Sequence, residues 1–497
     1  MHVDSEPRIT LREGLPRAVV MIALAIVAGW LTTFLGTPDY PIEQKQIMAV
    51  SIFVLIISAT LLFWTIRLAI AFLGIAIMLG MNVMTLPEMI MKTELHIILF
   101  LVGMMTLVGV LKDLGLFTWI IQIVINARKM SGKRFTLILV LLSGIMPGLV
   151  DEVTSIVFVL ALVFQVCDTL KVRPLPFVMM AVMATNVGST GTMLGNPVGI
   201  LIGSKAGLTF GSFLVHATPI MFASLMATLL LLLFWYRKDI ALLDERLKQR
   251  RAEHLGLGPL VRIPYRRGLI IMISSLVLIA LHHNLETWLG VADNTMLIVA
   301  PLAIAGVLMI YRNRRARHYI ERDVEWWTLL FFMMLFAVAG ALDSTGVTKN
   351  IAVHFTDTFG TNKYFLTPFI VGVTAVGSAF VDNIVFVAAF IPIVKSLVTD
   401  HPELHPLWWA MLFGSCFGGN ITAIGSTANI VALGMLEKSH NTHVSFFEWL
   451  KVGAVVGLVT CLIAASIILI FYYGDASVSA EAQQVLEQLA APHLAAP

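Results

Sequence analysis

Three carboxylates stand inside otherwise apolar stretches of this sequence. Asp151 and Glu152 follow the residues MPGLV, and Asp382 follows GSAFV. A charged side chain at membrane depth is costly, so such residues usually face a cavity and carry ions or protons. Because the first two are adjacent and repel each other, we expect one of them to hold a proton near neutral pH. Asp382 is then expected to hold a cation or to balance charge.

Two polar clusters accompany these acids, with the sequences ATNVGSTGTMLGNP and GGNITAIGSTAN. Glycine and proline interrupt helices and free backbone groups, while Asn, Ser and Thr add neutral oxygens and donors. Carbonyl oxygens suit a hard cation such as sodium, and helix N-termini suit an anion. Close packing through small residues is the alternative, but two clusters at matched positions favour binding. The candidate binding residues are Asn186, Gly188, Ser189, Thr190, Thr192, Gly195 and Asn196 in the first cluster and Asn420, Thr422, Gly425, Ser426, Thr427 and Asn429 in the second.

Long apolar runs must position these residues. Of 497 residues, 58% are hydrophobic and 13% are charged, and the mean hydropathy is +0.89. Soluble proteins are normally about a quarter charged. Many runs are long enough to cross about 30 Å of hydrocarbon as helices, which predicts an all-α polytopic membrane protein. The first run lacks a cleavage site and is expected to be a retained span. The three cysteines are too far apart for a metal motif and are expected in the core.

The distribution of basic residues predicts the topology. Short loops rich in Lys and Arg stay in the cytoplasm, and this applies to the N-terminus and to residues 128–134, 237–267 and 312–322. We therefore expect a multi-pass protein of the inner (plasma) membrane with about eleven transmembrane helices, a cytoplasmic N-terminus and an external C-terminus. This topology requires residues 135–168 and 364–396 to be re-entrant hairpins, with arms of about 15 residues that are too short to span.

The chain also repeats itself. When it is aligned with itself, LVGVLKDLGL (107–116) falls on VAGALDSTGV (338–347), and in the same register Asp151 falls on Asp382. After a shift of one position, Gly188 falls on Gly418. Five predicted crossings separate the two copies, and an odd number inverts the second copy, as in many secondary transporters. The predicted organisation is N-terminal scaffold spans (1–95), a first repeat (96–236, broken helix 176–200), the basic loop (237–267), linking spans (268–325), a second repeat (326–472, broken helix 407–434) and an external tail (473–497).

These motifs resemble the ion transporter superfamily, in the branch of arsenite permeases, sodium/proton antiporters and the P protein, with a citrate-transporter-like domain related to the divalent anion:sodium symporters. VDEVTS with TNVGSTGTMLGNP, and VDNIVF with GGNITAIGSTAN, carry the resemblance. It implies a homodimer with a scaffold, a moving transport domain and an elevator mechanism, and it adds Thr154 and Asn383 to the binding residues. The dicarboxylate carriers of this superfamily have Ser-Asn-Thr at both tips, which this chain lacks. Glu152 stands where the branch usually has Asn, which suggests a proton or cation role.

The sequence therefore predicts a secondary active transporter for a small ion, coupled to a proton or sodium gradient: a sodium/proton antiporter, or a carrier of an inorganic anion such as arsenite. The alternative is a sodium- or proton-coupled di- or tricarboxylate carrier on the same fold. No HExxH or GxSxG motif indicates an enzyme, and a structural scaffold would not need matched buried acids. The expected partners are the lipid bilayer and a small ion or small organic anion, without nucleic acid. No cofactor is expected apart from the coupling ion, and sodium is expected at the hairpin-tip and broken-helix residues.

Overall fold

Helices account for every regular element in the part of the chain that the computed structural model describes. Residues 11–36, 41–125, 127, 130–253, 264–292 and 295–474 are described, and none of them forms a strand. The predicted external tail lies outside these ranges from residue 475 onward, and so does the middle of the predicted basic loop, residues 254–263. The predicted all-α fold is confirmed.

The helices are long and apolar enough for a multi-pass membrane protein. Within the described residues, ten helices can cross a membrane by length and composition, or up to twelve if each of two bent pairs counts as one span. The bent pairs are Arg266–Ala280 with His282–Leu289, at 57°, and Thr295–Tyr311 with Asn313–Asp323, at 104°. Four of the ten are the arms of the two predicted hairpins, which the prediction of about eleven crossings does not count: Gly132–Val150, Glu152–Leu170, Lys363–Phe380 and Asn383–Asp400.

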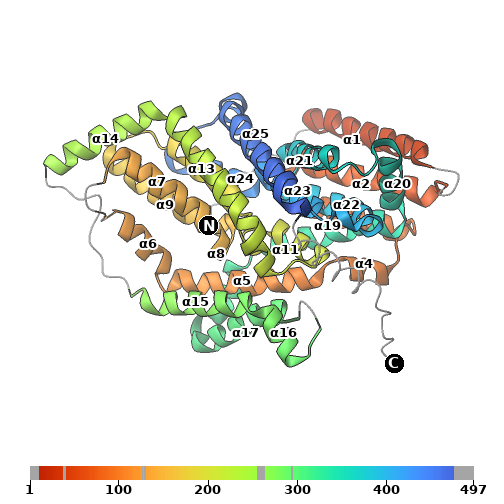
Figure 1. The fold of residues 1–497 in the computed structure, drawn as a ribbon, viewed down its shortest axis with the longest axis horizontal. Helices are drawn as coiled ribbons and strands as arrows, with labels where there is room; N and C mark the ends of the chain where they lie inside the picture. Colours follow the sequence, from red (N-terminus) through yellow and green to blue (C-terminus); the bar gives the residue numbers. More distant parts are fainter. Residues whose placement is uncertain are drawn as a thin grey trace. The chain divides into compact units, whose positions relative to one another are not determined.

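The chain divides into two compact units. Unit 1 is formed by Met1–Leu95, Trp326–Gly360 and Ala388–Leu397. In it, α1 and α2 pack side by side, and α19 contacts α2, α3 and α4 (Figure 1). An ion pair of 2.6 Å joins Lys92 to Asp343 at the end of α19. The helices of unit 1 are α1 (Leu11–Thr32), α2 (Gln44–Leu62), α3 (Arg67–Gly80), α4 (Leu86–Lys92), α19 (Trp326–Ser344) and α20 (Val347–Phe359).

Unit 2 is formed by His96–Glu325, Thr361–Val387 and Val398–Pro497, and it contains all the candidate binding residues. Its helices up to the first break and just beyond it are α5 (Leu95–Asp113), α6 (Leu116–Ile125), α7 (Gly132–Ile145), α8 (Pro147–Val150), α9 (Glu152–Leu170), α10 (Leu175–Gly188) and α11 (Pro197–Ala206). The later helices are α12 (Phe210–Ser212), α13 (Thr218–Trp235), α14 (Arg237–Ala252), α15 (Arg266–Ala280), α16 (His282–Leu289), α17 (Thr295–Tyr311), α18 (Ala316–His318), α21 (Lys363–Phe380), α23 (Leu407–Gly418), α24 (Thr427–His440) and α25 (Phe446–Phe471). The helix α22 (Asn383–Asp400) begins in unit 2 and passes through unit 1.

The hairpin arms are longer than the sequence predicts. Helix α9 has 19 residues and α21 and α22 have 18 each, because their apolar stretches remain helical beyond the ends expected from the sequence. Arm length alone therefore does not distinguish these helices from full crossings. The tips of the two hairpins distinguish them from full crossings, because each tip contacts a break between two helices, as described below.

The two repeats agree in backbone conformation as well as in sequence. Gly115 follows α5 with a φ of 74°, and Gly346 follows α19 with a φ of 80°. Glycine adopts this left-handed conformation without steric cost, which explains why it ends both helices. The two glycines occupy equivalent positions in LVGVLKDLGL and VAGALDSTGV.

Ion pairs account for the charges at the end of α5. The Asp113 carboxylate accepts hydrogen bonds from Arg315 at 2.7 Å and from the Tyr319 hydroxyl at 2.8 Å, and Lys112 lies 3.7 Å from Asp323. These partners follow the sharp bend after α17. The bent segment therefore packs against the end of α5.

Candidate functional site

The first hairpin turns at Asp151, between α8 and α9. Its φ of 130° and ψ of 162° form a conformation that residues other than glycine rarely adopt, at a typical cost of about 1–3 kcal/mol. The Asp151 carboxylate accepts a hydrogen bond of 2.9 Å from the backbone N–H of Thr154. Asp151 thus caps α9, and Thr154 contributes its backbone amide to this cap.

Glu152 is the first residue of α9 and is 6% exposed. Among the described residues, its Oε2 atom has no hydrogen-bond partner. Asp382, Asp151 and the hydroxyls of Ser189 and Ser426 face its carboxyl group. Two acids from opposite hairpins therefore interact inside the protein, where little water can screen their charges.

The second hairpin turns at Asp382. Its carboxylate accepts hydrogen bonds from the Thr427 hydroxyl at 2.6 Å and from the backbone N–H of Ile384 at 3.1 Å. The next residue, Asn383, accepts a hydrogen bond from Ser378 in the preceding arm. Asp382 and Asn383 are 4% and 3% exposed, so the predicted carboxylate at this tip is buried.

Three asparagines join the two breaks. The Asn186 Nδ2 atom donates to Asn420 Oδ1 and to Asn429 Oδ1, each at 2.8 Å. Asn429 Nδ2 donates to the carbonyls of Gly419 at 2.8 Å and Thr422 at 2.9 Å. All three asparagines are 0% exposed, and Asn186 Oδ1 has no partner among the described residues. The first break is thus bonded directly to the second, and one amide oxygen remains available.

Each break is also bonded to its own hairpin. The Thr192 hydroxyl donates to the carbonyl of Gly148 at 2.8 Å, and the Thr422 hydroxyl donates to the carbonyl of Ala379. The two donors are equivalent in the repeat, and so are the two acceptors. The repeat read from the sequence is therefore reproduced in individual hydrogen bonds.

Gly188 lets helix α10 approach the hairpin arm α7, and Gly418 lets helix α23 approach the hairpin arm α21. A Cβ atom on Gly188 would lie 1.9 Å from the Gly144 carbonyl oxygen, and one on Gly418 would lie 2.4 Å from Ala375 Cα. Gly195 and Gly425 likewise face the carbonyls of Ser189 and Gly419 at 2.0 and 2.8 Å. These four glycines allow two backbone segments to lie in close contact, because a side chain at any of them would collide with the neighbouring backbone.

We expect Gly188→Ala to destabilise the protein strongly. The added methyl group would meet backbone atoms, which cannot rotate away as a side chain can. The free energy of unfolding should therefore fall by about 3 kcal/mol or more, the upper end of the range typical of overpacking. Gly434→Ala is the matched control, because this glycine lies in helix α24 with nothing within 4 Å of the added atom. Thermal melts followed by size-exclusion chromatography would compare the two. Equal melting temperatures would contradict the observed packing.

The remaining predicted residues differ in their roles. Asn196 caps α11 by accepting from the Gly199 N–H, and its Nδ2 atom donates to Ser189 Oγ at 2.8 Å and to Cys416 Sγ at 3.2 Å. Thr190, in the turn that follows α10, donates to the Val187 carbonyl three residues earlier. The structure thus brings Ser189 and Asn196 into the site, whereas the Thr190 hydroxyl has a local partner.

Sequence reasoning missed several polar atoms of the site. Cys416, expected as a core residue, contacts Asn196 and lies near Glu152 and Asp382. The hydroxyls of Ser155 and Thr185 are buried without a partner in the described structure, and Trp449 donates to the Asn420 carbonyl at 3.0 Å. Helical spacing could have indicated one of them, since Ser155 lies three residues after Glu152 in α9.

The site is acidic overall. The buried polar and charged residues of the described chain include Glu152 and Asp382 but no Lys or Arg. No group of three or more His, Cys, Asp or Glu side chains among the described residues is arranged to hold a metal ion. A cation bound here would depend on the two acids, amide and hydroxyl oxygens and backbone carbonyls, which is the oxygen-rich environment that hard cations such as sodium prefer.

Buried acids, broken helices and hairpin tips in a multi-pass helical protein define the class of membrane transporters. The model of the citrate transporter family, CitMHS, matches residues 52–414. The chain belongs to this family.

Relatives agree with this assignment. An uncharacterized transporter of Mycobacterium tuberculosis is 34% identical over 406 residues, covering 80% of this chain and 92% of the relative. The P protein of Sus scrofa is 26% identical over 473 residues, covering 78% of this chain and 54% of the P protein. Among solved structures, the Alcanivorax borkumensis YdaH transporter has a TM-score of 0.49 at 15% identity, covering 92% of this chain and 98% of that one. The family match and the relatives confirm the predicted superfamily, and the chain is a membrane transporter.

Proposed function

We propose that this transporter moves a small ion by secondary active transport, coupled to a proton or sodium gradient. The observation that carries the proposal is that Glu152 and Asp382, at the tips of opposite hairpins, are both buried and lie within electrostatic range of each other. The described buried residues of the chain include no Lys or Arg. Two like charges that are both removed from water are strongly unfavourable unless a cation or a proton neutralises them. Loading and unloading the pair would therefore couple the gradient to the substrate.

A moving transport domain fits this proposal. The two hairpin tips and both breaks belong to one compact unit. The asparagine bonds connect the two breaks, and the Thr192 and Thr422 hydroxyls connect each break to its own hairpin. Neutralising the pair would remove the main electrostatic cost of carrying this unit across the bilayer. We propose elevator-type movement in a homodimer of the plasma membrane, with the N-terminus in the cytoplasm.

A carboxylate carrier is the second candidate, favoured by the description of the matching family as a citrate transporter. The N-termini of α11 and α24 lie at the breaks, where Asn196 and Ser426 cap them, and helix N-termini favour anions. Because the described site contains no buried Lys or Arg, a di- or tricarboxylate would need to bind together with a cation.

Flux into proteoliposomes would distinguish the two candidates. Purified protein would be tested with sodium, arsenite and citrate, each with and without imposed sodium and pH gradients. Gradient-driven movement of an inorganic ion, without inhibition by citrate or succinate, is the expected result. Citrate uptake driven by the same gradients, with competition by succinate, would replace the first proposal by the second.

A further inference from the structure

Helix α14 belongs to unit 2 and has no part in the proposed transport mechanism. It begins directly after α13, within a segment that the sequence predicts only as a basic loop. The aromatic residues Phe234 and Trp235 at the end of α13 are 70% and 44% exposed. Exposed aromatic residues at a span end are typical of the boundary between hydrocarbon and headgroups. Helix α14 therefore starts at the level of the lipid headgroups.

One face of α14 is fixed to the base of the first hairpin. Ile240, Leu243 and Leu247 are buried, and the Asp244 carboxylate accepts a hydrogen bond of 2.9 Å from the Gly132 N–H at the start of α7. A Cβ atom on Gly132 would lie 2.3 Å from the Ile240 carbonyl oxygen, so the two backbones are in close contact (Figure 1).

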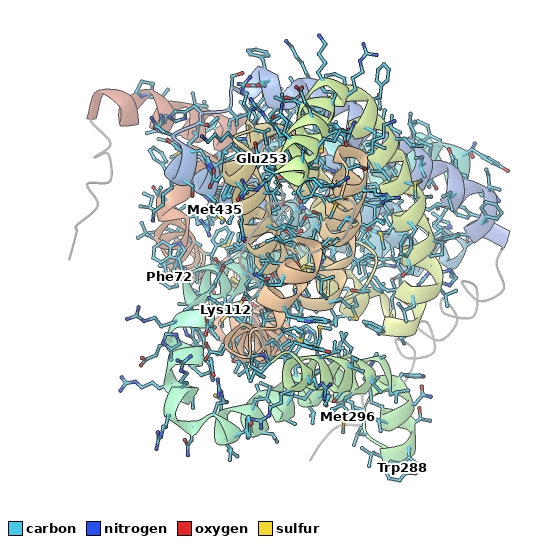
Figure 2. The ribbon with its side chains drawn as sticks, turned by 90° about the vertical axis from the view of Figure 1, so that its left-hand side faces the viewer. Phe72, Lys112, Glu253, Trp288, Met296 and Met435 are labelled. Carbon is cyan, nitrogen blue, oxygen red and sulfur yellow. The ribbon has the colours of Figure 1, made fainter. Side chains whose placement is uncertain are left out.

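A second bond fixes the other end of α14. Arg251 donates from Nη2 to the Met130 carbonyl at 2.6 Å, just before the described segment ends at Glu253 (Figure 2). Lys248 pairs with Asp244 at 2.8 Å. These charged groups are therefore occupied in holding the helix on the hairpin.

The opposite face of α14 carries a surplus of positive charge. Apart from Lys248 and Arg251, the exposed charged residues of the helix are three basic residues, Arg237, Lys238 and Arg246, and one acid, Glu245. Arg237, Lys238 and Arg246 are exposed, and Arg237 lies over the Phe234 ring at 5.5 Å. Cationic side chains beside an aromatic anchor at a membrane boundary attract anionic headgroups.

We propose that the exposed face of α14 binds anionic phospholipid headgroups, and that this binding stabilises the base of the first hairpin. Arg237, Lys238 and Arg246 would contact the lipid phosphates. The buried face would transmit the effect, because the Asp244–Gly132 bond joins α14 to the first residue of α7. Lipid composition would then influence a hairpin whose tip carries Asp151 and Glu152.

Hydrogen exchange of the full-length protein in nanodiscs tests this proposal. We expect the amides of residues 132–136 to exchange more slowly with phosphatidylglycerol present than in phosphatidylcholine alone. The combined variant Arg237→Gln, Lys238→Gln and Arg246→Gln should lose this lipid dependence and retain about tenfold less phosphatidylglycerol in native mass spectrometry. This variant keeps Asp244 and Arg251, so docking of the helix is preserved. High salt should weaken the lipid effect.

The matched control is Lys45→Gln with Lys349→Gln, two exposed lysines of unit 1, which should behave like the wild type. Equal lipid dependence in the combined variant and the wild type would overturn the proposal. So would equal protection by inorganic phosphate in phosphatidylcholine discs, because the surface would then bind free anions. Neither readout requires transport, so failure of the proposed function would leave this inference standing.

Discussion

Alanine at position 186 should abolish gradient-driven flux. Asn186 Nδ2 donates to Asn420 and Asn429, so truncation would leave two buried oxygens unpaired at about 1–3 kcal/mol each. It would also remove Asn186 Oδ1, an acceptor with no partner in the described structure. We expect Asn186→Ala to fold with a lowered melting temperature and to transport nothing in proteoliposomes.

Thr228→Val is the control for the loss of a buried hydrogen bond away from the site. Its hydroxyl donates to the Ser224 carbonyl within α13 and is 0% exposed. This variant should be destabilised slightly and should keep its flux. Normal flux in Asn186→Ala at a temperature where both variants are folded would show that the asparagine bonds are only structural.

Glutamine at position 152 should flatten the dependence of transport on pH. The neutral amide keeps the shape of the side chain but cannot take up a proton or oppose the charge of Asp382. Flux of the wild type should change steeply between about pH 6 and 8, as expected for a carboxyl group in a poorly hydrated site. The Glu152→Gln variant should lose this change and should melt at a higher temperature without ions, because like-charge repulsion is removed.

Asp382→Asn should have a different effect. The Asp382 carboxylate accepts from Thr427 and from the Ile384 N–H, so its loss weakens the tip and the cation site together, and coupled flux should disappear at every pH. Glu245→Gln, at an exposed acid of α14, is the control for removing one negative charge. An unchanged pH profile in Glu152→Gln would reject proton coupling through this residue.

Much of the site was predictable because its signals are local or repeated. The distribution of basic residues predicted hairpins at residues 135–168 and 364–396, and the glycines of the breaks predicted interrupted helices near the residues where α10 and α23 end. The register of the repeat predicted that Asp151 and Asp382 occupy equivalent tips. Such features follow from chain conformation, which a short stretch of sequence largely determines.

The partners of these residues were not predictable in the same way. Gly109 and Gly340 are equivalent in the repeat, yet Gly109 faces the Asp323 carboxylate and Gly340 faces the Lys92 side chain. Nothing near Asn186 in the sequence indicates Asn420 or Asn429. The basic composition of residues 237–267 predicted a loop but gave no sign that an acid there would hold the start of α7. Tertiary contacts of this kind depend on which surfaces meet, and one sequence carries little information about that.

The bond between Asn186 and Asn420 has a consequence for how the protein is made. The two residues are 234 positions apart, so at about 5–20 residues per second the ribosome needs about 10–50 s to supply the second after the first. During that interval the first repeat enters the bilayer with an interrupted helix whose amide lacks its final acceptors. Unsatisfied polar groups are costly in hydrocarbon, so the nascent first half must be sheltered by water, by the insertion machinery or by a temporary packing of its own until the second half arrives.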